Sequence, residues 1–179
     1  MNDAAPCDHL VEALERHDEK RRQGRAERIR WSSLYNVHAV GLFAGETEML
    51  NLLREAWECF VDGHFIATLT LATALVEHVI TEELERAGRL KDKMRFEDAI
   101  ATAREASLFP FDLLDQANSL RELRNGFAHR RQTQDKRIKD SLGSRYRVQR
   151  KHPTDILEED ARTAIVAMFG HFRHTLRRG

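Results

Sequence analysis

The chain has 179 residues, charged residues make up 32% of it, and its formal net charge is zero. This length favours one compact domain with appendages. With only three prolines and nine glycines, the composition is typical of an all-α protein and argues against a sheet-rich fold. Zero net charge excludes a global basic field that would attract nucleic acid, so any such contact must come from local patches.

Cysteine usage and hydropathy narrow the class of protein further. Cys7 and Cys59 form no metal-binding or disulfide pattern. His171 and His174 lie three residues apart without an accompanying carboxylate or cysteine pattern, so we expect surface histidines, no metal and no cofactor. The uncharged run of residues 63–76 is too short to span a bilayer. We therefore expect a cytoplasmic protein that does not contact a membrane.

Residues 1–45 are predicted to form an N-terminal helical extension or arm. A helix from Asp8 to about Arg22 would place Leu10, Val11 and Leu14 on one side. The charged run that continues this segment is typical of a solvated face or a flexible arm. Residues 31–43 are apolar and aromatic without a clear period, which indicates an irregular segment packed on the domain.

The periodic part of the chain begins near residue 46. Apolar residues at helical spacing predict one helix up to Asp62, ended by Gly63, and a second from His64 to about Ala87. The second helix is apolar around most of its circumference and is closed by Gly88. It is therefore predicted to be the central helix, buried on several sides.

Three further helices and a basic loop complete the prediction. A short amphipathic helix covers residues 96–108, and Pro110 opens the next helix. Residues 130–152 hold nine Lys or Arg and only two Asp, so residues 130–153 read as a basic loop. Asp155 and Glu158 resemble a capping box that starts a final helix. Residues 46–179 are thus predicted to form an antiparallel up-and-down bundle of four to five core helices.

The stretch LRELRNGFAHRRQ, residues 120–132, stands out within this bundle. Asn125 and His129 are four apart and share a helix face, whereas Arg124 falls on the core-facing stripe. A buried arginine needs a carboxylate, and Glu77 on the central helix is the candidate. Gly126 costs about 1 kcal/mol relative to alanine in a helix. It indicates a loosened helix or close approach of a packing partner, a substrate or a second subunit.

The string RNGFAH resembles the signature of the HEPN superfamily (higher eukaryotes and prokaryotes nucleotide-binding domain), in which an arginine precedes a histidine by four to six positions near the end of a bundle helix. The segment EAWECFVDGHFIATLTLATALVEHV is similar to the first helix pair of such domains. The resemblance covers roughly residues 46–131, and the last helix would complete the bundle.

This resemblance implies a helical bundle that commonly dimerises, with the arginine and histidine motifs of two subunits meeting in one cleft. Many such domains are metal-independent endoribonucleases. Others bind nucleotides, RNA or proteins without catalysis, or are toxins silenced by modification of a tyrosine two residues after the histidine. Arg131 stands at that position here, so this mode of silencing is not expected.

The residue types suit RNA cleavage without a metal. Such cleavage needs a base for the ribose 2'-hydroxyl, an acid for the leaving 5'-oxygen, and positive charge at the phosphate. His129 can transfer protons near neutral pH, and Arg124 offers a planar fork of donors. Asn125 could fix the imidazole or contact the phosphate. Because each chain supplies one such histidine, the hypothesis requires a homodimer.

Four basic residues are predicted to bind the phosphates of an RNA substrate: Arg130, Arg131, Arg145 and Arg147. The primary hypothesis is an endoribonuclease related to a toxin or defence system, with an antitoxin or regulatory protein as a partner. The alternative is a catalytically silent module that binds RNA, nucleotide or a protein. A third interpretation is a structural adaptor in which Arg124 forms an ion pair and His129 is a surface histidine.

Overall fold

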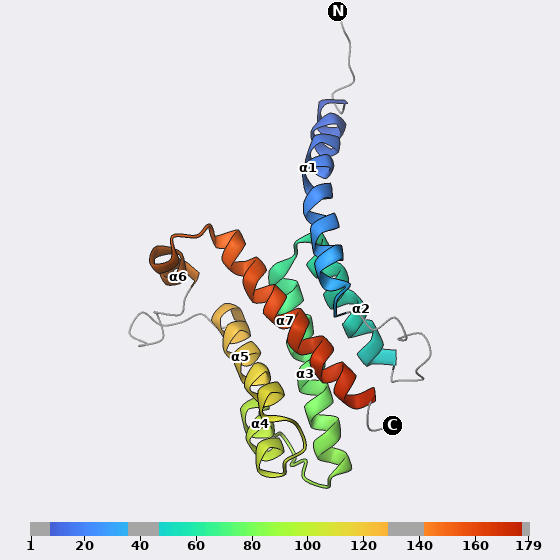
Figure 1. Cartoon of the computed structure of the whole chain (residues 1–179), viewed down its shortest axis with the longest axis vertical. Coiled ribbons are helices and arrows are strands. Elements are labelled where there is room, and N and C mark those ends of the chain that lie inside the picture. Colours follow the sequence, from blue (N-terminus) through green and yellow to red (C-terminus); the bar gives the residue numbers. More distant parts are fainter. Residues whose placement is uncertain (1–7, 36–46, 129–141, 177–179) are drawn as a thin grey trace, which may run out of the picture.

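The computed structural model describes residues 8–35, 47–128 and 142–176, and every regular element among them is helical. The helices are α1 (Asp8–Ser32), α2 (Thr47–Asp62), α3 (Phe65–Arg86), α4 (Phe96–Glu105), α5 (Phe111–Ala128), α6 (Leu142–Gln149) and α7 (Pro153–Leu176). They pack against one another around a shared apolar core (Figure 1). This arrangement confirms the predicted all-α class.

Helix α3 occupies the centre of the packed helices. It contacts α7, α2, α5 and α4, and its buried positions include Leu69, Leu75 and Ile80. Each such side chain contributes roughly 1.5–3 kcal/mol on burial, so the helix that is apolar on most sides becomes the middle one. By length and composition α3 could cross a membrane, but half of its apolar stretch is buried inside the protein, as is usual for a core helix.

The ends of α2 and α3 follow the glycines. Gly63 has φ +82° and Gly88 has φ +64°, a left-handed conformation that L-residues with a side chain adopt at a cost. The N–H of His64 donates to the Cys59 carbonyl at 2.8 Å, and the N–H of Arg89 donates to the Leu84 carbonyl at 2.8 Å. Both helix stops that the sequence predicted are confirmed.

Helix α7 begins earlier than the sequence indicated, and its cap is different. The N–H of Thr154 donates to Nδ1 of His152 at 3.3 Å, and Pro153 is the first helical residue. Proline suits this position because its missing N–H would have had no helical partner. His152 therefore caps the helix, and the predicted capping box at Asp155 is wrong because Asp155 already lies in the first turn.

A glycine lets α5 and α7 come close together. A Cβ atom built on Gly170 would lie 3.0 Å from Cδ2 of Leu113 and 3.8 Å from Oε1 of Gln116. Real Cβ atoms are rarely this close to a neighbour, so a larger residue here would require the Leu113 side chain to shift by a few tenths of an ångström. Gly170 thereby helps to set the position of α5, which carries the candidate site.

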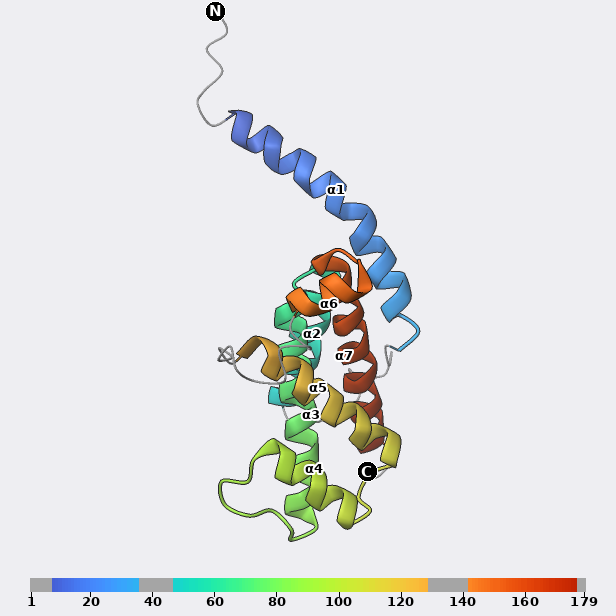
Figure 2. The same cartoon turned by 90° about the vertical axis from the view of Figure 1, so that its left-hand side faces the viewer.

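Helix α1 is longer than predicted, because the charged run lies within it and the helix continues to Ser32. Its C-terminal half is fixed to the other helices: Nε of Arg28 donates to the Val61 carbonyl at 2.9 Å, and Nε1 of Trp57 donates to Oγ of Ser32 at 2.9 Å. The Arg162 guanidinium lies 4.7 Å from the Trp31 ring centroid. The N-terminal half projects beyond the packed helices (Figure 2).

Candidate functional site

Helix α5 presents its predicted apolar stripe to the core. Leu114, Ala117 and Leu120 are fully buried, and the helix continues through Gly126 to Ala128. Arg124 lies one turn beyond Leu120 and is half-buried. The stripe therefore brings a guanidinium to the edge of the core near the end of α5.

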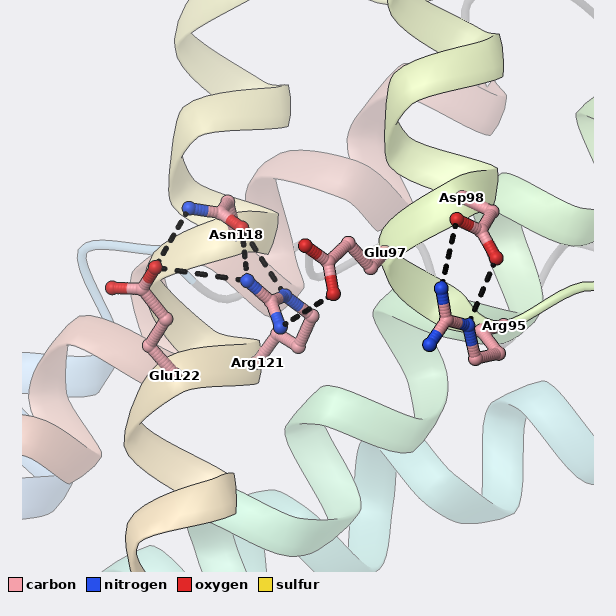
Figure 3. Close-up of polar contacts among 6 residues, drawn as sticks. All are labelled: Arg95, Glu97, Asp98, Asn118, Arg121 and Glu122. Atoms are coloured by element: carbon pink, nitrogen blue, oxygen red, sulfur yellow. Dashed lines mark hydrogen bonds and ion pairs between the residues drawn. The ribbon is translucent and has the colours of Figure 1, made fainter. Parts of the chain in front are cut away.

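One turn earlier on the same helix, Arg121 has its bonding groups paired within the chain (Figure 3). Its Nε and Nη2 atoms donate to Oδ1 of Asn118 at 3.2 and 3.0 Å. Its Nη1 atom donates to Oε2 of Glu97 on α4 at 3.3 Å, and Glu122 lies 3.6 Å from Nη2. Only 16% of the Arg121 side chain is exposed, so this arginine joins α4 to α5.

A second arginine in Figure 3 pairs near the start of α4. Arg95 donates to Asp98 from Nε at 3.0 Å. Its hydrogen bond lowers the pKa of the Asp98 carboxyl and raises the pKa of the Arg95 guanidinium. Both side chains are largely exposed, so this pair contributes little to stability. This exposed pair contrasts with the more buried pairs of Arg121 and Arg145.

Arg124 differs from both of these arginines. Its Nε atom is buried without a hydrogen-bond partner, and among the described residues no ion pair or hydrogen bond joins its guanidinium to another side chain. An orphaned buried donor costs about 1–3 kcal/mol. A buried donor without an acceptor is found where a ligand can bind, or where the acceptor is outside the described residues.

The predicted pair between Glu77 and Arg124 is not formed in this structure. Glu77 is half-buried on α3, which packs against α5, but the two side chains make no ion pair within the described part of the chain. Arg124 is only partly buried, so water can solvate its outer nitrogens and an internal carboxylate is not required. The roles proposed for Glu77 and Arg124 in a site remain predictions.

Two other carboxylates are the deeply buried ones, and the sequence analysis did not single them out. Glu83 on α3 is bound by Nη1 of Arg86 at 2.6 Å. Asp160 on α7 forms a bidentate pair with Arg145, with distances of 2.6 and 2.8 Å. The signal for Asp160 was its spacing of four from Ile156 and from Ala164, which are both fully buried.

The predicted phosphate-binding residues differ in what they contact. Arg145 belongs to α6, a helix within the predicted basic loop, and its pair with Asp160 fixes α6 to α7. The loop prediction is therefore wrong for residues 142–149, and Arg145 has a structural partner. Arg147 is exposed on the same helix, next to Tyr146, which is also exposed. Arg147 is thus the better candidate to contact a phosphate.

The remaining residues of the motif are only partly described. Asn125 and Gly126 are half-buried near the end of α5. His129, Arg130 and Arg131 lie outside the described residues. Helix α6 lies at the same end of the molecule as the end of α5 in both views (Figures 1 and 2). The described basic residues of α6 and the unpaired Arg124 are therefore at one end of the packed helices.

The expectation of two surface histidines on the last helix is wrong. His171 is fully buried, with Nδ1 2.8 Å from the Ala167 carbonyl, and His174 is half-buried with Nε2 3.3 Å from the Leu108 carbonyl. Both rings make tilted contacts with the Phe109 ring, with ring centroids 5.8 and 4.8 Å apart. Burial lowers the pKa of His171 to about 4, so this histidine is neutral at physiological pH. His171 is a core residue, because the ring of Phe109 packs against it.

No group of three or more His, Cys, Asp or Glu side chains in residues 8–35, 47–128 and 142–176 is arranged to hold a metal ion. The chain matches no protein-family model, no curated protein and no solved structure. The candidate site is accordingly defined by its own residues: the unpaired Arg124, the adjacent Asn125, and the exposed Arg147 of the neighbouring basic helix.

Proposed function

We propose that this protein is a metal-independent endoribonuclease of the HEPN type. The observation that supports this function best is the Arg124 guanidinium, whose buried Nε has no partner while Arg121, one turn away, is fully engaged. An unpaired arginine at the edge of a core offers a phosphate a charged, directional donor set. The motif RNGFAH then places a histidine five residues further along the chain.

The finer fold assignment belongs to the same proposal. The chain direction alternates along α2, α3, α5 and α7 (Figure 1), which agrees with an antiparallel up-and-down bundle, and α1 is its N-terminal extension. In this proposal residues 46–179 form the HEPN-like unit. The end of α5 and helix α6 then lie at one end of the bundle (Figures 1 and 2).

The proposed reaction uses two subunits. Neutral His129 of one subunit takes the proton of the ribose 2'-hydroxyl, and the 2'-oxygen forms a bond to phosphorus. The bond from phosphorus to the 5'-oxygen breaks, and the protonated His129 of the partner subunit gives its proton to that oxygen. The products are a 2',3'-cyclic phosphate and a 5'-hydroxyl. Arg124 stabilises the extra negative charge on the phosphate oxygens.

Other residues would orient the substrate. Asn125 lies on the face of α5 that His129 would share, where it could hold the imidazole or a phosphate oxygen. Arg147, together with Arg130 and Arg131, would neutralise neighbouring phosphates and give salt-dependent binding without sequence preference. Tyr146 is exposed beside Arg147 and could stack on a base.

The experiment is cleavage of a 5'-labelled single-stranded RNA by the purified protein in EDTA. We expect fragments with cyclic phosphate ends, and we expect them to disappear with His129→Ala but to persist with His64→Ala, which changes an exposed histidine between α2 and α3. A protein that binds the RNA but leaves it intact would instead be the silent module. Neither binding nor cleavage of this RNA would leave the structural adaptor, or a silent module that binds nucleotide or a protein.

A further inference from the structure

Helix α1 carries a strong asymmetry of charge along its length. Residues 8–19 contain five acidic residues and one arginine, whereas residues 20–32 contain six basic residues and one glutamate. The projecting half is therefore acidic, and the half fixed to the bundle is basic (Figure 2). Two such helices side by side attract each other only when they run in opposite directions.

One stripe of six side chains along α1 follows the same asymmetry. The stripe steps by 4, 3, 4, 3 and 4 residues, which keeps its members within about 80° of one another around the helix. It reads apolar, acidic, acidic, basic, basic, apolar. Its members are Val11, Glu15, Asp18, Arg22, Arg25 and Ile29. Reading the stripe backwards exchanges the acidic and basic positions and keeps the apolar ends. Two antiparallel copies of the stripe are therefore complementary in charge.

The stripe is separate from the surface by which α1 contacts its own bundle. Arg28, Ser32 and Trp31 make that contact, and they lie about 60–160° away around the helix from the centre of the stripe. Val11 is 54% exposed and Ile29 is 45% exposed. Among the described residues, Arg22 pairs with Glu19 on its own helix, with both side chains about three-quarters exposed, and such a pair is easily exchanged.

We propose that α1 pairs with α1 of a second copy of this chain, antiparallel, about a two-fold axis near Lys20. In that register Val11 lies opposite Ile29 of the partner subunit, Glu15 opposite the partner's Arg25, and Asp18 opposite the partner's Arg22. The two-fold axis repeats each contact, so four ion pairs and two apolar contacts form along the stripe. Every charged member of the stripe gains a partner of opposite sign.

This interface is distinct from the contact between α5 ends that the proposed ribonuclease requires. The two attachment points near Ser32 would lie about 36 Å apart along the helix pair, at 1.5 Å per residue. The α1 pairing therefore places the two helical bundles at opposite ends of the paired α1 helices. It holds whether or not the chain cleaves RNA, and it would link two molecules while leaving the α5 end of each one open.

Charge reversal provides the first test, with sedimentation of the full-length chain at low ionic strength. We expect Glu15→Arg/Asp18→Arg alone and Arg22→Glu/Arg25→Glu alone to weaken self-association through α1 at least about tenfold. Mixing the two variants restores it, because each supplies the charges that the other lacks. Arg16→Glu/Lys20→Glu makes the same change in charge as the second variant on the far side of the helix, and is expected to self-associate like the wild type.

Disulfide trapping tests the relative orientation of the two α1 helices. The chains used carry Cys7→Ser and Cys59→Ser, so that the native cysteines cannot cross-link. Chains with Val11→Cys, mixed with chains with Ile29→Cys, should form a cross-linked heterodimer, and either chain alone should form far less. Cross-linking of Val11→Cys with itself at the same rate would overturn the antiparallel pairing. Failure of the mixed charge variants to associate, or identical behaviour of both variants and the wild type, would overturn the interface.

Discussion

Two arginines one turn apart on α5 have opposite surroundings. Arg121 donates to Asn118 and to Glu97 on the neighbouring helix, so its charge is used to join α4 to α5. Arg124 has a buried Nε with no partner. The comparison teaches that burial alone does not make an arginine structural. An arginine bonded to neighbouring helices, such as Arg121, stabilises the fold, whereas the unpaired Arg124 is the residue for which we propose an anionic ligand.

The largest effect on stability is expected where an internal pair is most buried. Arg145→Leu would leave the Asp160 carboxylate, which is 5% exposed, without its bidentate partner. Removing one member of a buried pair costs about 3 kcal/mol or more. Urea unfolding of the variant measures this loss. Asp160→Asn/Arg145→Leu should recover part of it, because no charge is then left buried; equal losses in both variants would contradict the account.

The next effect depends on pH and involves His171. Desolvation lowers its pKa from 6.5 to about 4 in the folded protein, with the charge of His174 adding to this and the bond to Ala167 opposing it. As the pH falls, this histidine is therefore protonated in the unfolded chain before it is protonated in the folded protein. The contribution of the neutral His171 to the free energy of unfolding is fully present above about pH 6.5. It falls by roughly 3 kcal/mol as the pH approaches 4.

Unfolding curves measured between pH 7 and pH 4 test this dependence. His171→Leu should flatten the part of the curve that this histidine causes, even if the variant is less stable at pH 7. His17→Gln changes an exposed histidine of α1 and should leave the curve as it is in the wild type. An unchanged slope in His171→Leu would mean that the buried ring is not the group that titrates.

A smaller effect is expected at Arg121. Arg121→Leu removes its bonds to Asn118 and Glu97, and the partners are partly solvated, so the loss should be about 1 kcal/mol. Arg95→Leu is the matched control from the same close-up (Figure 3), because its pair with Asp98 is exposed, and its unfolding should match the wild type. If both variants unfold alike, Arg121 does not join α4 to α5.

Much of the fold could be predicted because local signals and packing agree. Gly63 and Gly88 end helices in the left-handed conformation that glycine tolerates, and the apolar stripe of Leu114, Ala117 and Leu120 is buried as its period required. The stripe also placed Arg124 at the edge of the core. These features depend on residues close together in the sequence, where periodicity and turn chemistry are informative.

Two of the errors have a common cause, which is contact between distant segments. Helix α6 was predicted as a loop because Gly143 and Ser144 are poor helix formers and its flanks are basic, but the pair between Arg145 and Asp160 fixes it to α7. His171 was expected on the surface, and Phe109 from the connection before α5 packs over it. Periodicity within one helix does not reveal which distant residue will cover it.

The smallest effect on stability and the largest on activity are expected at the same residue, and this contrast is the most direct test. Arg124→Leu removes an unsatisfied buried donor but also the packing of the arginine stem, and because these two effects oppose each other its free energy of unfolding should match the wild type within about 0.5 kcal/mol. Its RNA cleavage in EDTA should fall at least about 100-fold, while Arg121→Leu keeps its activity. Wild-type cleavage by Arg124→Leu, or a loss of stability like that of Arg145→Leu, would contradict the account.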